Sequence, residues 1–141
     1  MIGELSILIA EDDPDDLELI AEACQNIAPK IRVMSVKNGQ EVFVTLNSIS
    51  EDELPCLIIL DFNMPLLNGL QVLHKLKLTD RYKNICTVVY SAGVNSEYVS
   101  EILKTGAVGF FEKSNTVQKI EADMRRIFAS SELITEHLIL N

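Results

Sequence analysis

The sequence predicts an α/β protein built on a doubly wound, five-stranded parallel sheet with five helices, and three observations lead to this prediction. Five short runs of the chain are mainly apolar, and runs of this kind are typical of parallel strands that are covered on both faces. Segments with the apolar spacing of amphipathic helices alternate with these runs, which implies right-handed crossovers. The length of 141 residues suits a single domain with a substantial core.

The predicted strands cover residues 5–10, 31–36, 56–60, 86–90 and 108–111, and a helical stripe of apolar residues follows each of them. Residues that cap a helix or turn the chain precede every stripe. In chain order they are Asp13 with Pro14, Asn38 with Gly39, Asn68, Asn95 or Ser96, and Ser114 or Asn115. Gly106 is expected to end the fourth helix in a left-handed conformation.

The predicted domain covers residues 1–130, and the tail of residues 131–141 is additional to the five strand–helix units. This tail is unusually apolar, since it contains Leu133, Ile134, Leu138, Ile139 and Leu140. Three roles are open for it: it extends the last helix, packs back on the domain, or forms a homodimer.

The composition is that of a globular protein with an excess of acidic residues. The formal net charge of −9 argues against non-specific binding to nucleic acid and against an anionic membrane surface as partner. Cys24, Cys56 and Cys86 form no CxxC motif, and we interpret them as small buried residues of a protein in a reducing compartment. Because the sequence has neither the pattern of a signal peptide nor an apolar run that could span a bilayer, we expect a cytoplasmic protein.

Polar residues gather where the predicted strands end. Glu11 and Asp12 follow the first strand, Asp61 the third, Ser91 the fourth and Lys113 the fifth. If the strand order is 2-1-3-4-5, these residues meet at the point where the order reverses, which is where open α/β sheets bind ligands. Crowded carboxylates favour a hard cation such as Mg²⁺, which also binds phosphate oxygens. A carboxylate nucleophile, a hydroxyl donor and an ammonium are the groups that phosphoryl transfer needs.

A purely structural interpretation explains some of these acids. Loops are polar and helix N-termini favour anions, which is sufficient for Asp15 and Asp16 in the first turn of a helix and for Asp12 taken alone. It does not explain Asp61, which follows a wholly apolar strand where nothing in the local structure requires an acid.

Four motifs, taken together, resemble the receiver domain of two-component response regulators. They are ILIAEDDP (residues 7–14), LDFNMPLLNGL (60–70), VYSA (89–92) and GAVGFFEK (106–113), and the similarity spans residues 4–130. The resemblance implies a flavodoxin-like fold with strand order 2-1-3-4-5. It implies a protein that accepts a phosphoryl group from a sensor histidine kinase or phosphotransfer protein and then binds a downstream protein target. It implies no turnover of a substrate.

The resemblance also implies a role for individual residues. Asp61 matches the phosphoacceptor. Glu11 and Asp12 match the acidic pair that holds Mg²⁺, and of the two Asp12 is expected to bind the ion directly. The backbone carbonyl of Asn63 is expected to complete the metal site. Three further positions match groups that respond to phosphorylation: the switch hydroxyl Ser91, the phosphoryl-binding Lys113 and the aromatic switch residue Phe110, for which a plain core position is equally compatible.

One departure from the family pattern and two alternative functions remain. Ser114 follows Lys113 where the family usually has proline, often after a cis peptide bond, and a cis bond before serine costs about 2.5–4 kcal/mol. The first alternative is a degenerate receiver that serves only as a binding module. The second is a Mg²⁺-dependent phosphatase with Asp61 as nucleophile, but such enzymes commonly carry an acid two residues later, where this chain has Asn63.

Overall fold

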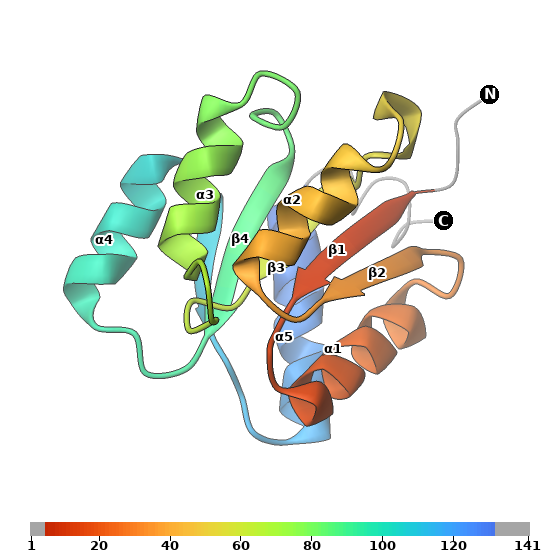
Figure 1. The fold of residues 1–141 in the computed structure, drawn as a ribbon. Coiled ribbons are helices and arrows are strands. Elements are labelled where there is room, and N and C mark those ends of the chain that lie inside the picture. The colour runs from red at the N-terminus through yellow and green to blue at the C-terminus, as the bar shows by residue number, and fades with distance from the viewer. Residues whose placement is uncertain (1–4, 132–141) are drawn as a thin grey trace.

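The computed structural model describes residues 5–131, which form a five-stranded parallel sheet with helices on both faces (Figure 1). The strand order is β2-β1-β3-β4-β5, as predicted, and every neighbouring pair is parallel. The strands are β1 (Ser6–Ala10), β2 (Arg32–Val36), β3 (Leu57–Leu60), β4 (Cys86–Ser91) and β5 (Gly109–Glu112). Each begins and ends within one residue of its predicted range. The apolar runs mark the central strands β1, β3 and β4, which are buried, and also the edge strands β2 and β5, which are only partly buried.

Five α-helices connect and follow the strands: α1 (Pro14–Ile27), α2 (Gly39–Asn47), α3 (Gly69–Leu78), α4 (Ser96–Thr105) and α5 (Val117–Ser130). A short 3₁₀ helix, η1 (Glu51–Glu53), lies in the acidic loop before β3. Gly106 ends α4 with a φ of 118°, as its position predicts.

Side chains cap the helices largely where the sequence predicts them. The side chains of Asp13, Asn38, Asn68 and Asn95 accept hydrogen bonds from backbone N–H groups in the first turns of α1 to α4. The predicted cap of α5, Ser114 or Asn115, is wrong: Thr116 caps this helix and accepts from the N–H of Lys119. The physical reason lies in the tertiary structure: the N–H of Ser114 donates to Asp123, which holds Ser114 in the loop before the helix, and the first helical turn begins only after Thr116.

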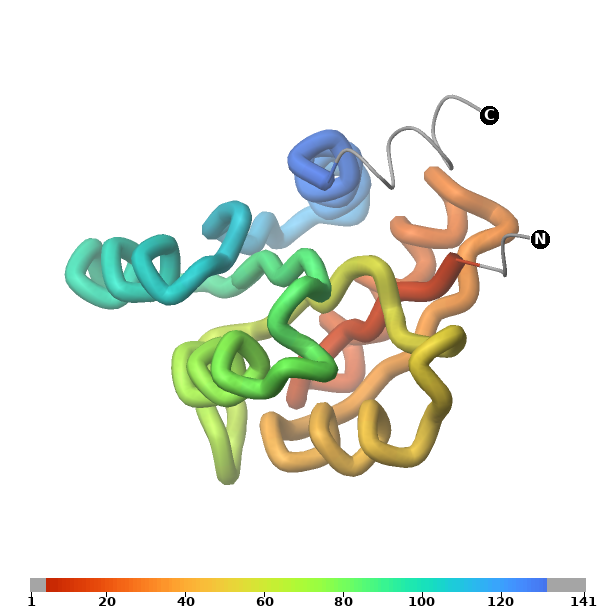
Figure 2. Tube along the Cα trace, turned by 90° about the horizontal axis from the view of Figure 1, so that it is seen from above, coloured from red at the N-terminus to blue at the C-terminus, as the bar shows by residue number. Residues whose placement is uncertain are grey.

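The sheet separates two hydrophobic cores, and Figure 2 shows it between two layers of helices. On one face, Ile7, Ile9, Ile59 and Tyr90 pack against α1 and α5. On the other face, Leu8, Ile58, Leu60 and Val89 pack against α2, α3 and α4. Because the three central strands are buried on both faces, their carboxyl ends have little freedom to move.

Backbone hydrogen bonds between neighbouring strands continue past the strand ends. The N–H of Glu11 donates to the carbonyl of Val36 at 3.0 Å, and the N–H of Asp61 donates to that of Ala10 at 2.9 Å. On the other side of the sheet, the N–H of Lys113 donates to the carbonyl of Ser91 at 3.0 Å. These bonds bring the residues after β1, β3 and β5, with the last residue of β4, to one edge of the sheet, where the strand order reverses between β1 and β3.

Three further sequence predictions concern the cysteines, membrane-spanning segments and the apolar tail. Cys24 is buried as predicted, whereas Cys56 and Cys86 are half-buried, and all three are free thiols. Among residues 5–131, no helix combines the length and apolarity needed to cross a membrane. The apolar residues of the tail lie outside the described residues, so its three predicted roles remain predictions.

Candidate functional site

Three carboxylates converge at the carboxyl edge of the sheet. Glu11 and Asp12 follow β1 and Asp61 follows β3, and one carboxylate oxygen from each lies within 4.8 Å of the others. Glu11 and Asp61 are buried, at 2 % and 6 % exposure, while Asp12 faces solvent. We refer to these three residues as the acidic cluster. Two buried anions side by side repel each other, so the arrangement favours a cation with oxygen ligands.

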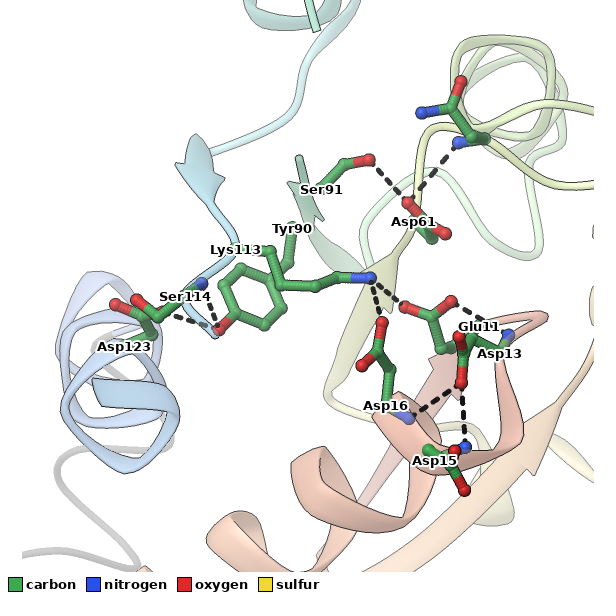
Figure 3. A network of polar contacts seen from close by, with 11 residues as sticks. Glu11, Asp13, Asp15, Asp16, Asp61, Tyr90, Ser91, Lys113, Ser114 and Asp123 are labelled. Atoms are coloured by element: carbon green, nitrogen blue, oxygen red, sulfur yellow. Dashed lines mark hydrogen bonds and ion pairs between the residues drawn. The ribbon is translucent and has the colours of Figure 1, made fainter. Parts of the chain in front are cut away.

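Asp61 is held by two hydrogen-bond donors. The Ser91 hydroxyl donates to Asp61 Oδ1 at 2.5 Å, and the backbone N–H of Asn63 donates to the same oxygen at 3.4 Å (Figure 3). Ser91 is completely buried at the end of β4, so its hydroxyl is fixed beside the carboxylate rather than shared with solvent. The two donors orient the Asp61 side chain in the sheet edge.

The start of α3 lies unusually close to Asp61. The N–H of Gly69 donates to the Phe62 carbonyl at 2.8 Å, and a Cβ at this glycine would lie only 2.7 Å from the Asp61 carbonyl oxygen. A side chain cannot be accommodated at that distance without a shift of backbone. The absence of a side chain at Gly69 therefore allows the helix to approach the strand end that carries Asp61.

Lys113 reaches across the sheet edge from β5 to the opposite acids. Its Nζ lies 2.5 Å from Glu11 Oε1 and 3.2 Å from Asp16 Oδ2, as Figure 3 shows. Burial raises the pKa of Glu11 to about 7 despite the hydrogen bond from Lys113, and the charge of Asp61 adds to the rise. Burial by itself would lower the pKa of Lys113, but its bond to Glu11 and the charges of Asp61 and Glu11 raise it instead. The ammonium is thus held in its charged form.

The structure brings together five of the predicted site residues: Glu11, Asp12, Asp61, Ser91 and Lys113. Asn63 is adjacent through its backbone N–H, whereas the predicted role concerns its carbonyl. Phe110 lies on β5 half-buried against the core under α2, α3 and α4. Both the switch role of Phe110 and its role as a core residue are compatible with this position. The described residues contain no cis peptide, so the Lys113–Ser114 bond is trans.

Sequence reasoning missed three polar residues that contact the site or its neighbours. Asp16 was explained as a first-turn helix acid, yet it also binds Lys113. Tyr90 and Asp123 form a buried hydrogen bond behind the site, at 2.5 Å. A signal for this pair existed, because a tyrosine inside an apolar strand and an acid on the apolar stripe of a helix each require a polar partner when buried.

The fold and the site together define a single-sheet α/β protein with an acidic site at its topological switch point. Comparison with protein families identifies one family that matches most of the chain. Residues 7–125 match the response regulator receiver domain, and the chain belongs to this family. The predicted flavodoxin-like fold and the two-component resemblance are thereby confirmed.

Individual relatives agree with this assignment. The chain is 31 % identical, over 94 % of its length, to the nitrate/nitrite response regulator protein NarL of Escherichia coli, and covers 59 % of NarL. It is 33 % identical, over 78 % of its length, to the putative two-component response regulator ARR21 of Arabidopsis thaliana, and covers 17 % of that protein. The chain thus spans less than two thirds of each of these relatives.

Solved structures show the same fold. The phosphorylated cyanobacterial phytochrome response regulator RcpA superimposes with a TM-score of 0.82 at 26 % identity, covering 92 % of this chain and 95 % of that one. The chemotaxis response regulator CheY4 of Vibrio cholerae superimposes with a TM-score of 0.73 at 18 % identity, covering 89 % of this chain and 99 % of that one.

Proposed function

We propose that this receiver domain is a phosphorylation switch in which Asp61 accepts a phosphoryl group from a histidine kinase or a phosphotransfer protein. The observation that carries the proposal is the environment of Asp61, a buried carboxylate that has a buried hydroxyl donor on Oδ1 and lies in one cluster with Glu11 and Asp12. A carboxylate oxygen of Asp61 attacks the phosphorus atom, the bond from phosphorus to the donor breaks, and an aspartyl phosphate remains.

The metal expected at this site is Mg²⁺. The donor set consists of carboxylate oxygens, which suits a hard cation, and the residues that would hold it are Glu11, Asp12 and Asp61, with the backbone carbonyl of Asn63. When bound, the ion would neutralise charge on the acids and on the transferring phosphoryl oxygens. Burial raises the pKa of Glu11 to about 7, and a cation bound beside the carboxyl would favour its ionised form.

The other residues act on the phosphoryl group after transfer. The Ser91 hydroxyl, which donates to Asp61 Oδ1 before transfer, would turn its hydrogen bond to a phosphoryl oxygen. Lys113 would exchange a carboxylate partner for a phosphoryl oxygen. Phe110, on the same strand as Lys113, would follow the movement of Ser91 as a packing change, because its ring carries no hydroxyl. These shifts would alter the surface of α4, β5 and α5 and so change protein binding.

Similarity supports the proposal at the level of the family. RcpA, at 26 % identity, is described as a phosphorylated response regulator, and NarL and ARR21 are described as response regulators. The net charge of −9 supports an output through protein binding rather than nucleic acid, and a cytoplasmic location follows from the proposed role. Asn63, whose amide is neither a general acid nor a base, argues against a phosphatase.

Intact-mass spectrometry tests the proposal. The protein is incubated with Mg²⁺ and acetyl phosphate beside the variant Asp61→Asn, and one phosphoryl adduct is expected that disappears in the variant and with chelator. If the adduct is too short-lived to be detected, binding of beryllofluoride, a stable mimic of the phosphoryl group, is measured instead. If the native protein takes neither phosphoryl group nor beryllofluoride, the domain is a degenerate receiver that serves as a binding module.

A further inference from the structure

A second polar network lies directly behind the site and centres on Asp123 of α5 (Figure 3). The carboxylate is only 2 % exposed, and its Oδ2 accepts two hydrogen bonds, from the Tyr90 hydroxyl at 2.5 Å and from the Ser114 backbone N–H at 3.2 Å. Its other oxygen, Oδ1, accepts from the guanidinium of Arg126. One carboxylate on the helix thereby contacts both the end of β4 and the loop after β5.

The two groups on Oδ2 are the direct chain neighbours of two site residues. Tyr90 precedes Ser91, and Ser114 follows Lys113. A backbone hydrogen bond of 3.0 Å from the Lys113 N–H to the Ser91 carbonyl joins the same two positions. Tyr90 is itself 1 % exposed, so its ring and hydroxyl are fixed by the core. Asp123 therefore fixes the backbone on both sides of the link between Ser91 and Lys113.

Packing alone gives no reason for an acid at this position. The neighbouring positions on the buried face of α5 are apolar, namely Ile120, Met124 and Ile127, each 3 % exposed or less. Burial of a carboxylate is unfavourable, and apolar replacements of buried ionic groups are often neutral or stabilising. The reason for an acid at this position is therefore the set of hydrogen-bond donors that its carboxylate binds.

The residue after Lys113 makes this contact available. A proline there would have no backbone N–H, whereas Ser114 supplies the donor that reaches Asp123. In this chain a hydrogen bond to α5 thus holds the backbone directly after Lys113.

We propose that Asp123 is a positioning residue for phosphoryl transfer to Asp61, acting through the Tyr90 hydroxyl on Ser91 and through the Ser114 N–H on Lys113. This inference rests on the function proposed above. Asp123 touches neither donor nor phosphoryl group; it binds the chain neighbours of Ser91 and Lys113, the residues whose hydroxyl and ammonium reach the reaction site. Since displacements of about 1 Å are sufficient to slow a positioned reaction by up to about 100-fold, loss of this anchor has a measurable effect.

The test measures the initial rate of adduct formation with acetyl phosphate at saturating Mg²⁺. Asp123→Leu removes both bonds of Oδ2, and we expect it to slow the reaction at least about tenfold. Tyr90→Phe removes one bond without changing the ring, and a smaller decrease of about threefold is expected. The matched control is Met124→Leu, a change of similar volume at a fully buried neighbour on the same helix, for which the rate stays within about twofold.

A second measurement separates positioning from general destabilisation. In the Lys113→Ala background the path through the ammonium is already lost, so Asp123→Leu has at least about a threefold smaller effect there than in the native protein. An equal effect in both backgrounds, or native rates for both Asp123→Leu and Tyr90→Phe, would overturn the proposal. If Asp123→Leu does not fold by circular dichroism, Tyr90→Phe decides alone: its effect should be at least about threefold smaller in the Ser91→Ala background, where the path through the hydroxyl is already lost, and an equal effect in both backgrounds would overturn the proposal.

The failure of this proposal differs from the failure of the proposed function. If native protein forms no adduct and binds no beryllofluoride, Asp61 is no phosphoacceptor and positioning for phosphoryl transfer is excluded with it. If native protein is phosphorylated and the Asp123 and Tyr90 variants react at its rate, the function stands and only the positioning role is overturned.

Discussion

Lys113 and Glu11 form an ion pair across the sheet edge, with Nζ of the lysine 2.5 Å from Oε1 of the glutamate. The two side chains are only 12 % and 3 % exposed, so water screens the pair little. In the structure the ammonium is bound to Glu11 and Asp16. In the proposed function, a phosphoryl group on Asp61 would compete with these carboxylates for the ammonium, and the energetic balance of the proposed switch would depend on this competition.

The first prediction concerns Asp16, the more exposed of the two partners of Lys113, at 37 % exposure. Asp16→Asn weakens the hold on the ammonium before phosphorylation and leaves the phosphoryl-bound state less affected. Because partly exposed ion pairs contribute about 0.2–1 kcal/mol, beryllofluoride should bind about 1.4- to fivefold more tightly. Titration of the native protein and the variant with beryllofluoride measures the change.

Asp15→Asn is the matched control for this prediction. Asp15 is an exposed acid in the same helical turn, and its backbone N–H, rather than its carboxylate, takes part in the cap of α1. The control removes the same charge without removing a bond to Lys113. Equal tightening in both variants would mean that general electrostatics, and not the Asp16–Lys113 pair, controls beryllofluoride affinity.

The second prediction concerns pH and Glu11. Burial raises the pKa of this carboxyl from 4.5 to about 7, so between these values the folded protein binds more protons at Glu11 than the unfolded chain does. The contribution of Glu11 to stability is complete below pH 4.5 and is lost as the pH rises through about 7. The loss is of the order of 1–3 kcal/mol.

Urea unfolding at several pH values in the presence of a chelator measures this loss. The native protein is compared with Glu11→Gln, which lacks the ionisable group, so the difference in unfolding free energy isolates Glu11 from the other acids. A difference that stays constant from pH 4.5 to pH 7 would show that the carboxyl titrates at its usual value. Added Mg²⁺ should reduce the pH dependence, because a bound cation favours the ionised carboxylate.

The third prediction concerns the close approach at Gly69. Gly69→Ala places a Cβ 2.7 Å from the Asp61 carbonyl oxygen, so the backbone that carries Asp61, the proposed nucleophile, has to move. We expect a loss of about 1–3 kcal/mol of stability together with slower phosphorylation. Thermal unfolding and the rate of adduct formation with acetyl phosphate measure the two effects.

Gly39→Ala is the control, because this glycine also begins a helix and its Cβ would lie 2.2 Å from the Leu67 carbonyl oxygen. The control suffers the same kind of backbone clash but does not touch Asp61. Both variants should lose stability, and Gly69→Ala should lose more of its phosphorylation rate per kcal/mol of lost stability. A common ratio for the two variants would assign the slower rate to destabilisation alone.

The extent to which the sequence predicts this structure depends on the range of the interactions. The caps of α1 to α4 act within one helical turn and are correctly predicted from local residues, as Asp13 and Asn68 illustrate. The cap of α5 is wrongly predicted because Ser114 is held outside the helix by a bond from its N–H to Asp123, which lies nine residues further along the chain.

Long-range contacts explain why some site residues are predictable from the sequence and others are not. Glu11, Asp61 and Ser91 are predictable because each follows or ends an apolar strand, and the parallel topology brings strand ends together. The contact between Asp16 and Lys113 joins residues 97 positions apart, and that between Tyr90 and Asp123 joins residues 33 apart. Tyr90 and Asp123 each stand on an apolar face, which signals that each needs a polar partner. No local pattern identifies the partner in either contact, so only the folded chain reveals the pairing.

The last prediction concerns Ser91, whose hydroxyl donates to Asp61 Oδ1 at 2.5 Å inside the protein. Ser91→Ala leaves the nucleophile intact but removes this donor, which in the proposed function binds a phosphoryl oxygen. Hydrogen bonds to charged groups contribute about 1.5–3 kcal/mol, so beryllofluoride should bind about 10- to 100-fold more weakly while an adduct with acetyl phosphate still forms. Thr87→Val is the matched control, because Thr87 carries another fully buried hydroxyl on β4, and this one donates to the Ile85 carbonyl at 3.1 Å, away from the site. If both variants bind beryllofluoride equally well, the Ser91 hydroxyl is a structural partner of Asp61 and takes no part in the switch.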